Sequence, residues 1–504
     1  MKTLPALLSL SLACAASASE KPNIILIMAD DMGWSDIGCY GAVHIRTPHI
    51  DRIAREGMLF TQFYNNAKCT TTRASLLTGL YPRKGGKGIE LIGKDMLTLG
   101  EALRGAGYST GMSGKWHNGS SVGTRPWDRG FDEAYGLWDG ASNFFNPLQP
   151  DPKFKGGAVR VSGHNDDIIT EFPAGFYATD AFGDHAVETI RKHAKSGKPF
   201  FHYLPFTAPH YPLHAKPEDI AAYKGKFSAG WDSLIKERRA NQIRMGLIDP
   251  ETWPDIRGID KVQAWDEAKG IGEDWQNLRM ETYAAMVTSM DHNIGKVLAA
   301  LDELGIARNT LILFLSDNGS CSETPGGNDT AQIPGPKEFY SHVGPGWAHF
   351  QNTPFRKYKS TSHEGGIATP LVARWPAAIK PGSRTDAVGH IIDFMPTFLA
   401  AAGTEYPGGE KLLPLEGKSL LPLFKGEASI RSPDDTLFWH WAGTRAVRQG
   451  DWKIVSHGKS KAWELYDLST DRTETKNLAS KHPDRVNGLA GKWDDWAAAT
   501  GVRK

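Results

Sequence analysis

Cysteine is scarce in this chain. Only four of the 504 residues are cysteines, and Cys14 lies in an apolar N-terminal stretch unlike the rest of the sequence. The other three, Cys39, Cys69 and Cys321, are too few and too widely spaced for a disulfide framework. This excludes a small fold held together by disulfides. Cys39 and Cys321 either pair with each other or lie buried as small apolar groups, and burial is the favoured alternative.

Net charge and long apolar runs are also nearly absent. The 58 Lys and Arg residues balance 57 Asp and Glu residues, which gives a formal charge of +1. This balance, without long basic runs, argues against nucleic acid or an anionic membrane as the main partner. No window beyond the N-terminus approaches the roughly 20 apolar residues that a membrane-spanning helix needs. The sequence therefore predicts no stable membrane span.

The N-terminus has the pattern of an export signal. Lys2 precedes an apolar run over residues 4–16, and Ala16-Ser17-Ala18 is a small-residue cleavage pattern. We predict that residues 1–18 are a secretory signal peptide and that the exported chain is periplasmic or secreted. Lipidation of Cys14 is the less favoured alternative, because Ser11 stands where an acylation box has leucine.

The order of apolar runs predicts an α/β fold. Short apolar, β-branched runs are typical of strands buried on both faces of a sheet, and here they alternate with helical patterns. The predicted strands are residues 23–29, 108–113, 200–205 and 311–316, and the predicted helices include residues 99–105, 180–194 and 283–304. This pattern indicates a large, mostly parallel sheet flanked by helices.

Each predicted strand ends at a polar cluster. Because ligands of parallel sheets bind beyond the carboxyl ends of the strands, we expect the clusters to converge on one crevice. The two acidic clusters offer hard oxygen ligands and neither thiolate nor imidazole, which favours Ca²⁺ or Mg²⁺ over zinc. Taken singly, such clusters are more often turns or helix caps. The four clusters are Asp30-Asp31, Lys115-Trp116-His117, His210 and Asp317-Asn318.

The sequence changes character near residue 405, where proline and glycine mark a loop-rich connection. Beyond it, residues 436–441, 444–447 and 452–455 have the pattern of a strand meander, and residues 486–499 that of a closing helix. We predict a catalytic domain over residues 19–428 and a small α+β subdomain with an antiparallel sheet over residues 429–504. A charged segment, residues 216–277, contains four tryptophans and is either a functional insertion or a set of surface helices anchored by tryptophan.

One run points to a particular chemistry. It begins Cys69-Thr70-Thr71-Thr72-Arg73 and continues to Gly79. The run resembles the maturation signature of the formylglycine-dependent sulfatases, in which the cysteine is oxidised to an aldehyde (3-oxoalanine) whose hydrate is the nucleophile. The family usually has Pro or Ala where this chain has Thr71, and often Leu where it has Asn118.

The resemblance extends over essentially the whole mature chain and implies the fold of the alkaline-phosphatase-like superfamily. Residues 223–226 and 230–232 further resemble the bacterial arylsulfatase branch. The other matching stretches are residues 23–31 with Gly33 and Asp36, 114–117, 208–210, 316–319, Lys359 with 364–366, and 464–468 through 477–478.

Residue by residue, the resemblance implies a metal site and a catalytic set. Asp30, Asp31, Asp317, Asn318 and the modified Cys69 would hold one divalent cation, Ca²⁺ or Mg²⁺ in its place. Arg73 would steady the formylglycine, and the helix that begins near it would add positive potential behind the nucleophile. The groups that would surround the sulfate are Lys115, His117, His210 and Lys359.

The implied reaction is the hydrolysis of a sulfate ester. The metal and the cationic side chains would neutralise the sulfate oxygens that otherwise repel a nucleophile. His210 and Lys359 would protonate the departing alcohol, Asp317 would help to deprotonate the nucleophile, and His117 would act as the base that releases sulfate. A formylglycine-generating enzyme is implied as a maturation partner.

Two alternatives stay open. One is a phosphate or phosphonate esterase on the same scaffold. The other is a non-catalytic, metal-dependent binder of sulfated glycans, which follows if Cys69 is not matured. The sequence does not identify the substrate among aryl sulfates and sulfated carbohydrates, nor the sulfate position, exo or endo action, or oligomeric state. Aromatic residues that would either stack on sugar rings or close a core edge are Trp138, Phe144, Phe145, Trp439 and Trp441.

Overall fold

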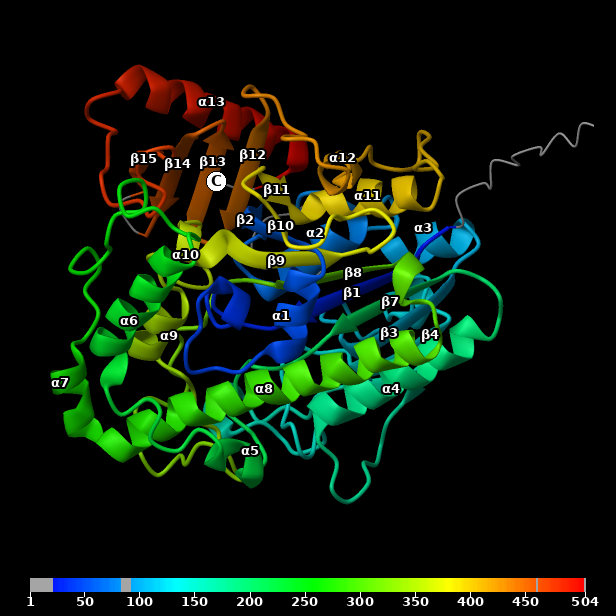
Figure 1. Cartoon of the computed structure of the whole chain (residues 1–504), viewed down its shortest axis with the longest axis horizontal. Coiled ribbons are helices and arrows are strands. Elements are labelled where there is room, and N and C mark those ends of the chain that lie inside the picture. Colours follow the sequence, from blue (N-terminus) through cyan, green and yellow to red (C-terminus); the bar gives the residue numbers. More distant parts are fainter. Residues whose placement is uncertain (1–20, 83–91, 459–460, 503–504) are drawn as a thin grey trace, which may run out of the picture.

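The computed structural model describes residues 21–82, 92–458 and 461–502. The predicted signal peptide lies outside these residues. The main feature is a large sheet with helices on both faces, and a second, smaller sheet stands beside it with the C-terminal helix packed against it (Figure 1). The predicted fold class, a mostly parallel sheet flanked by helices with a separate antiparallel sheet, is confirmed.

The large sheet has 11 strands within the described ranges. Its centre is parallel, in the order β8, β1, β7, β3, β4, whereas β9 runs antiparallel to its neighbours β8 and β2. The strands, in spatial order, are β10 (Ser383–Thr385), β2 (Met58–Tyr64), β9 (Ala368–Arg374), β8 (Thr310–Ser316), β1 (Asn23–Ala29), β7 (Phe200–Pro205), β3 (Ser109–Lys115), β4 (Glu133–Leu137), β5 (Ser162–His164) and β6 (Asp167–Ile168), and β11 (Gly389–His390) pairs with β2.

Strand β1 shows why the central strands read as continuous apolar runs. Ile25 and Ile27 face one core and Leu26 and Met28 face the other, and all four are fully buried. One face is covered by α1 (Pro48–Arg55), α4 (Ala178–Ala194) and α8 (Glu273–Glu303), with α4 and α8 lying side by side (Figure 1). The other face is covered by α2 (Cys69–Thr78), α3 (Leu99–Gly105), α11 (Phe394–Ala401) and α12 (Leu421–Phe424).

The sequence located the strands better than the helix ends. The predicted strands at 23–29 and 200–205 coincide with β1 and β7, and the other two differ from β3 and β8 by one or two residues. Helix α8 begins ten residues before the predicted helix at 283. Its first turns bury Arg279, whose guanidinium group lies over the ring of Trp275. A charged residue therefore stands on the buried face and interrupts the apolar pattern by which a helix is predicted.

The tryptophans of residues 216–277 are structural anchors. This segment forms α5 (Pro217–Ala221), α6 (Gly230–Arg244) and α7 (Trp265–Ala268). Trp231 contacts Trp265 and Trp347 edge-on, with ring centroids 4.8 and 5.2 Å apart, and Trp347 lies on α9 (Pro345–Gln351). The segment is therefore anchored to the main core by edge-to-face aromatic contacts, as the alternative of surface helices anchored by tryptophan predicts.

The smaller sheet is an antiparallel meander, as predicted. Its strands are β12 (Thr436–Trp441), β13 (Thr444–Gln449), β14 (Trp452–His457) and β15 (Trp463–Asp467), and α13 (Pro483–Thr500) packs against it. A buried ionic contact joins it to the main sheet, because Lys453 on β14 contacts Glu364 at 2.7 Å and Glu474 at 2.8 Å. Glu364 begins α10 (Glu364–Ile367), which follows the loop that carries Lys359.

Candidate active site

Two adjacent parallel strands bring the acidic clusters together. The register pairs Ala29 of β1 with Ser316 of β8, so the residues that follow both strands meet at one edge. The backbone amide of Asp31 donates to Asp317 Oδ1 at 3.2 Å, and Asn318 Nδ2 donates to Asp31 Oδ1 at 2.6 Å. Asp31 has a positive φ of 63°, which turns its side chain back toward this edge. Three carboxyl groups therefore converge on one buried point.

Each carboxyl group is matched by a buried cation. Lys115, the last residue of β3, donates to Asp30 Oδ2 at 2.5 Å. Lys359 donates to both oxygens of Asp31 at 2.6 and 2.8 Å. Arg73 donates to Asp317 Oδ2 at 2.8 Å from one terminal nitrogen and at 3.2 Å from Nε. These alternating charges make burial tolerable, since an unpaired buried charge costs several kcal/mol.

Helix α2 delivers Cys69 and Arg73 to the same point. Cys69 is the first residue of α2 and Arg73 lies one turn later, so the two side chains share a face. A terminal nitrogen of Arg73 also donates to the carbonyl of Lys115 at 2.8 Å, which links α2 to the end of β3. Cys69 is 2 % exposed. The predicted helix near Arg73 is present, with its N-terminus at the cysteine.

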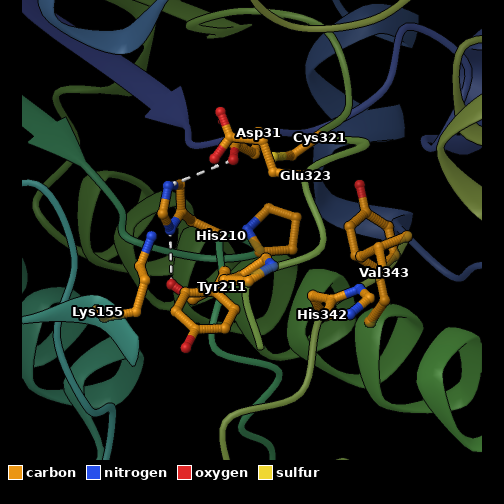
Figure 2. A pocket seen from close by; sticks show the side chains of 11 residues that line it. Asp31, Lys155, His210, Tyr211, Cys321, Glu323, His342 and Val343 are labelled. Carbon is orange, nitrogen blue, oxygen red and sulfur yellow. Dashed lines mark hydrogen bonds and ion pairs between the residues drawn. The ribbon is translucent and has the colours of Figure 1, made fainter. Parts of the chain in front are cut away.

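Two histidines complete the set. His117 has a positive φ of 56°, and burial together with Lys115 and Arg73 holds its pKa well below its usual range. Its buried Nδ1 has no hydrogen-bond partner among the described residues. His210 lies between Asp31 and the carbonyl of Tyr211, with contacts of 3.3 and 2.6 Å (Figure 2). Burial lowers the pKa of His210 to about 3, although Asp31 opposes the shift.

The functional groups line one cavity of about 360 Å³. Cys69, His117, His210 and Lys359 all face it. Its wall also includes charged residues that the sequence reasoning did not single out. They come from loops without periodicity or a motif, so no local signal marks them. They are Lys68, Asp139, Asp151, Lys155, Arg160 and Glu323.

The acidic cluster fits a hard divalent cation. Asp30 Oδ1 and Asn318 Oδ1 are buried oxygens without a hydrogen-bond partner in the described chain, and such orphaned acceptors are rare unless a ligand uses them. Burial, with a smaller contribution from the neighbouring Asp30, raises the pKa of Asp317 to about 6. The donors of Asp30, Asp31, Asp317 and Asn318 are carboxylate and amide oxygens, which suit Ca²⁺ or Mg²⁺. One ring nitrogen of His210 lies within 4.8 Å of oxygens of Asp30 and Asp31.

Comparison with known proteins identifies the family. The family model described as "Sulfatase" matches residues 22–404, and one described as "N-sulphoglucosamine sulphohydrolase, C-terminal" matches residues 357–487. The chain belongs to the sulfatase family. The first match covers the large sheet and every residue of the acidic and basic clusters. The candidate active site of this sulfatase therefore lies within the region that the family model describes.

Relatives and solved structures agree with this assignment. The sulfatase is 34 % identical to an uncharacterized sulfatase of Schizosaccharomyces pombe over 96 % of this chain and 95 % of that protein. It is 32 % identical to an arylsulfatase of Klebsiella aerogenes, which covers 86 % of this chain and 97 % of that one. The crystal structure of Ps i-CgsB in complex with k-i-k-neocarrahexaose superimposes with a TM-score of 0.70 at 27 % identity, over 95 % and 93 % of the two chains.

The other candidates from the sequence divide into two groups. Trp138, Phe144 and Trp439 are buried at 1 % exposure each. Phe144 and Trp439 therefore close core edges of the sulfatase, whereas Trp138 lines the cavity that Cys69 faces. Phe145 and Trp441 are partly exposed. The three cysteines in the described residues, Cys39, Cys69 and Cys321, are free thiols. None of the helices described here is both long and apolar enough to cross a membrane.

Proposed function

We propose that this sulfatase hydrolyses sulfate esters of carbohydrates or aryl alcohols with a formylglycine formed from Cys69 and one divalent cation. Asp30, Asp31, Asp317, Asn318 and the modified Cys69 would hold Ca²⁺, with Mg²⁺ as the replacement. The observation that carries the proposal is that Cys69, His117, His210 and Lys359 line one cavity beside three buried carboxyl groups, each of which is paired with Arg73, Lys115 or Lys359.

The bound groups would supply what the side chains lack. The hydrated aldehyde provides a hydroxyl nucleophile, and the cation provides a Lewis acid for the sulfate oxygens. A sulfate ester resists attack because its oxygens carry negative charge. Lys115 contacts Asp30 at 2.5 Å and Lys359 contacts Asp31 at 2.6 Å. Both ammonium groups would therefore present positive charge to a bound sulfate ester in a site shielded from water.

The two histidines suit different proton transfers. His117 is held neutral by burial and by the cations beside it, and its Nδ1 is unpaired, so this ring can accept a proton. His210 faces Asp31, and a bound sulfate would add a second negative charge nearby. That charge raises the pKa of His210, so the ring can carry a proton for the departing alcohol. Lys359 is the second proton donor in reach of the same cavity.

The substrate class follows from the relatives only in outline. One relative is named an arylsulfatase and one solved neighbour holds a neocarrahexaose. The cavity wall combines Lys155 and Arg160 with Asp139, Asp151 and Glu323, a polar lining that suits hydroxyl-rich sugars better than a purely apolar alcohol. We therefore favour a sulfated carbohydrate as the natural substrate. The signal peptide predicted over residues 1–18 supports an exported, periplasmic or secreted location.

Release of free sulfate from a panel of sulfated oligosaccharides tests the reaction. The protein is produced together with a formylglycine-generating enzyme and assayed in Ca²⁺. We expect at least one sulfated sugar to be cleaved, and matched phosphate and phosphonate esters to be poor substrates. Faster cleavage of the phosphorus esters would assign the protein to the esterase alternative. Binding of sulfated glycans without release of sulfate would assign it to the binder alternative.

Peptide mass spectrometry tests the nucleophile. The peptide that contains Cys69 should show the lower mass of an aldehyde in an active preparation. The backbone N–H of Thr71, in the first turn of α2, has no partner within the helix. Its hydroxyl donates to the carbonyls of Asn66 and Lys68 at 3.0 Å. Because Thr71 lies in the first turn of α2, proline is tolerated there. Thr71→Pro should keep activity or raise the modified fraction, and a fully active preparation with unmodified Cys69 would refute the proposal.

A further inference from the structure

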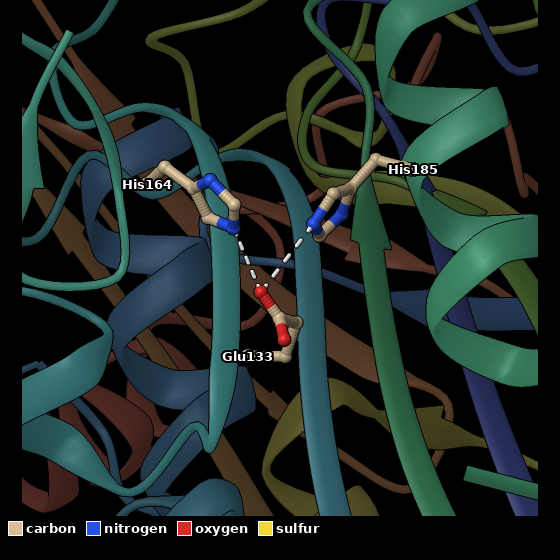
Figure 3. A group of neighbouring side chains, drawn as sticks. All are labelled: Glu133, His164 and His185. Atoms are coloured by element: carbon tan, nitrogen blue, oxygen red, sulfur yellow. Dashed lines mark hydrogen bonds and ion pairs between the residues drawn. The ribbon is translucent and has the colours of Figure 1, made fainter. Parts of the chain in front are cut away.

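A second cluster of ligand-type side chains lies away from the candidate active site. Glu133 is the first residue of β4, and the last residue of that strand, Leu137, pairs with Lys115 at the crevice end. Four residue steps of about 3.3 Å put Glu133 roughly 13 Å from that end. His164 ends β5 and His185 lies on α4, and both rings point toward the Glu133 carboxylate (Figure 3). Three separate elements therefore meet at this cluster.

The distances suit one small cation. Glu133 Oε1 lies 2.8 Å from His164 Nε2 and 3.8 Å from His185 Nε2, and the three candidate ligand atoms lie within 4.8 Å of one another. A tetrahedral zinc ion with bonds of about 2.0–2.1 Å needs its ligand atoms roughly 3.4 Å apart. The required value lies between the two carboxylate–imidazole distances found, and shifts of about half an ångström would bring both to it. The two histidine nitrogens lie within 4.8 Å of each other and would move closer on the ion.

The outer contacts orient His185 and Glu133 as a metal site requires. Ser113 Oγ bonds His185 Nδ1 at 2.7 Å and His202 Nε2 at 3.0 Å, which leaves His185 Nε2 facing the carboxylate. The ring of Tyr135 lies 4.9 Å from the ring of His185 and restricts its rotation. Asn165 Nδ2 donates to Glu133 Oε1 at 3.3 Å. Metal-binding histidines are held through their other ring nitrogen in this way.

We propose that Glu133, His164 and His185 bind one Zn²⁺ ion, with the fourth position open to solvent. Two imidazoles and one carboxylate form a donor set that zinc prefers and Ca²⁺ does not. The His164 side chain is 50 % exposed, which gives the ion a path from solvent. The ion would tie β5, the second strand from this edge, to β4 and α4, and so stabilise this end of the sheet. This site is independent of the proposed reaction.

Lys192 provides an internal probe of the site. Its Nζ lies 2.6 Å from Glu133 Oε2, so it occupies the carboxylate oxygen that the proposed ion does not use. The lysine side chain is 67 % exposed and free to swing away. A positive charge this close weakens the binding of a cation. Lys192→Ala should therefore raise the zinc affinity, whereas removal of a ligand should lower it.

The test is zinc binding to the whole protein. Purified enzyme is stripped with a chelator, saturated with Ca²⁺ to fill the carboxylate cluster, and titrated with Zn²⁺ by calorimetry and by thermal unfolding. We expect one zinc ion per chain and a higher unfolding temperature. His164→Ala should weaken zinc binding by at least about tenfold, the lower end of the loss seen even for outer contacts. Because His164 is half exposed, this variant should keep its fold, which circular dichroism checks.

His44→Ala is the matched control. His44 Nε2 lies 2.9 Å from Glu237 Oε2, the same pairing with a carboxylate but outside any group of three ligand-type residues in the described chain. Its loss should leave zinc binding unchanged. The proposal is overturned if the wild-type protein binds no stoichiometric zinc in the presence of Ca²⁺, or if folded His164→Ala binds zinc as tightly as the wild type.

Discussion

The ionic clusters at the two ends of strands β3 and β4 differ in burial and in the type of ligand atom that they offer. At the carboxyl end, Asp30, Asp31 and Asp317 are completely buried and each is paired with its own Lys or Arg. Near the other end, one carboxylate serves two imidazoles at a partly exposed edge. Oxygen donors in a dry site favour a hard cation, whereas nitrogen donors favour zinc. One stretch of sheet therefore offers two sites with different metal preferences.

Burial also sets what each cluster can do. At the carboxyl end, an anion enters among cations that water does not screen, so small displacements there change the free energy of a transition state strongly. At the second cluster His164 is half exposed while Glu133 and His185 are mostly buried, so a bound ion would link three elements near the surface. We therefore expect substitutions at the first cluster to alter turnover and substitutions at the second to alter zinc binding and stability.

The largest effect should come from Cys69→Ala. This change removes the thiol that the proposed maturation would convert, and loss of a covalent nucleophile typically lowers the rate by roughly 10⁴-fold or more. Steady-state release of sulfate measures it, with His44→Ala as a surface control that should keep wild-type kcat/KM. If Cys69→Ala retained even a tenth of the activity, the reaction would not depend on Cys69, and the proposed active site at the carboxyl ends of the strands would be wrong.

The next effect separates leaving-group chemistry from sulfate capture. If His210 and Lys359 protonate the departing alcohol, His210→Ala and Lys359→Ala should lower kcat on a sulfated sugar by about 10²- to 10⁴-fold. The same changes should cost far less on nitrophenyl sulfate, whose leaving group needs no proton. Rate constants on both substrates decide the matter. Equal losses on the two would show that these residues only bind sulfate.

Metal exchange tests the contrast between the two donor sets directly. A chelated enzyme should lose at least about a hundredfold in kcat/KM, because a catalytic cation supplies several kcal/mol and each factor of ten is about 1.4 kcal/mol. Ca²⁺ or Mg²⁺ should restore turnover, and Zn²⁺ alone should raise the unfolding temperature without restoring it. Full restoration by Zn²⁺ alone would contradict the predicted preference for oxygen-bound, hard cations.

The smallest effect concerns the loop that carries Lys359. Asp260, from the tryptophan-anchored segment, contacts Arg356 and Lys357, and although burial opposes them these partners lower the pKa of Asp260 from 3.8 to about 2. The folded pKa is below the unfolded one, so the contact stabilises the protein above about pH 4, and this stabilisation is lost as the pH falls toward 2. At 1.36 kcal/mol per pKa unit, Asp260→Asn should cost about 2 kcal/mol at pH 7.

Urea unfolding at several pH values checks this expectation. Asp255→Asn is the matched control in the same segment, because Asp255 pairs locally with the exposed Arg257. Exposed pairs contribute about 0–1 kcal/mol, so this variant should unfold near the wild-type midpoint. A difference between wild type and Asp260→Asn that persisted unchanged to pH 3 or below would show that shape, not charge, holds the loop.

The sequence was most informative where local chemistry is strict. Strands β1 and β7 are buried on both faces, and only apolar, β-branched runs fit such positions, so their ends were predicted without error. The short strands β5 and β6, three and two residues long, carry too few side chains to show a period. β5 forms by pairing with β4, and β6 by pairing with β5, so His164 owes its position to the edge that β4 offers.

The same division holds for the candidate sites. The motif around Cys69 and the order of the polar clusters named the predicted active-site residues, because motif and order are properties of the chain itself. Most of these residues end or follow a strand or lie in the first turns of α2, whereas Lys359 lies in a loop. Pairing is different. That Lys115 contacts Asp30 while Lys359 contacts Asp31 depends on β3, β1 and a distant loop meeting in space. The charged wall of the cavity, including Arg160 and Glu323, depends on loop conformation alone.

By itself, the sequence determined the layered α/β architecture, the separate C-terminal meander and the family to which the chain belongs. These follow from periodicity and from short motifs, which are local properties of the chain. Only the tertiary structure decided which carboxyl group meets which cation, and that Glu133, His164 and His185 share one point in space. The physical reason is that charge pairing and metal coordination depend on distances of a few ångströms between elements far apart in sequence, and the packing of the sheet and its helices fixes those distances.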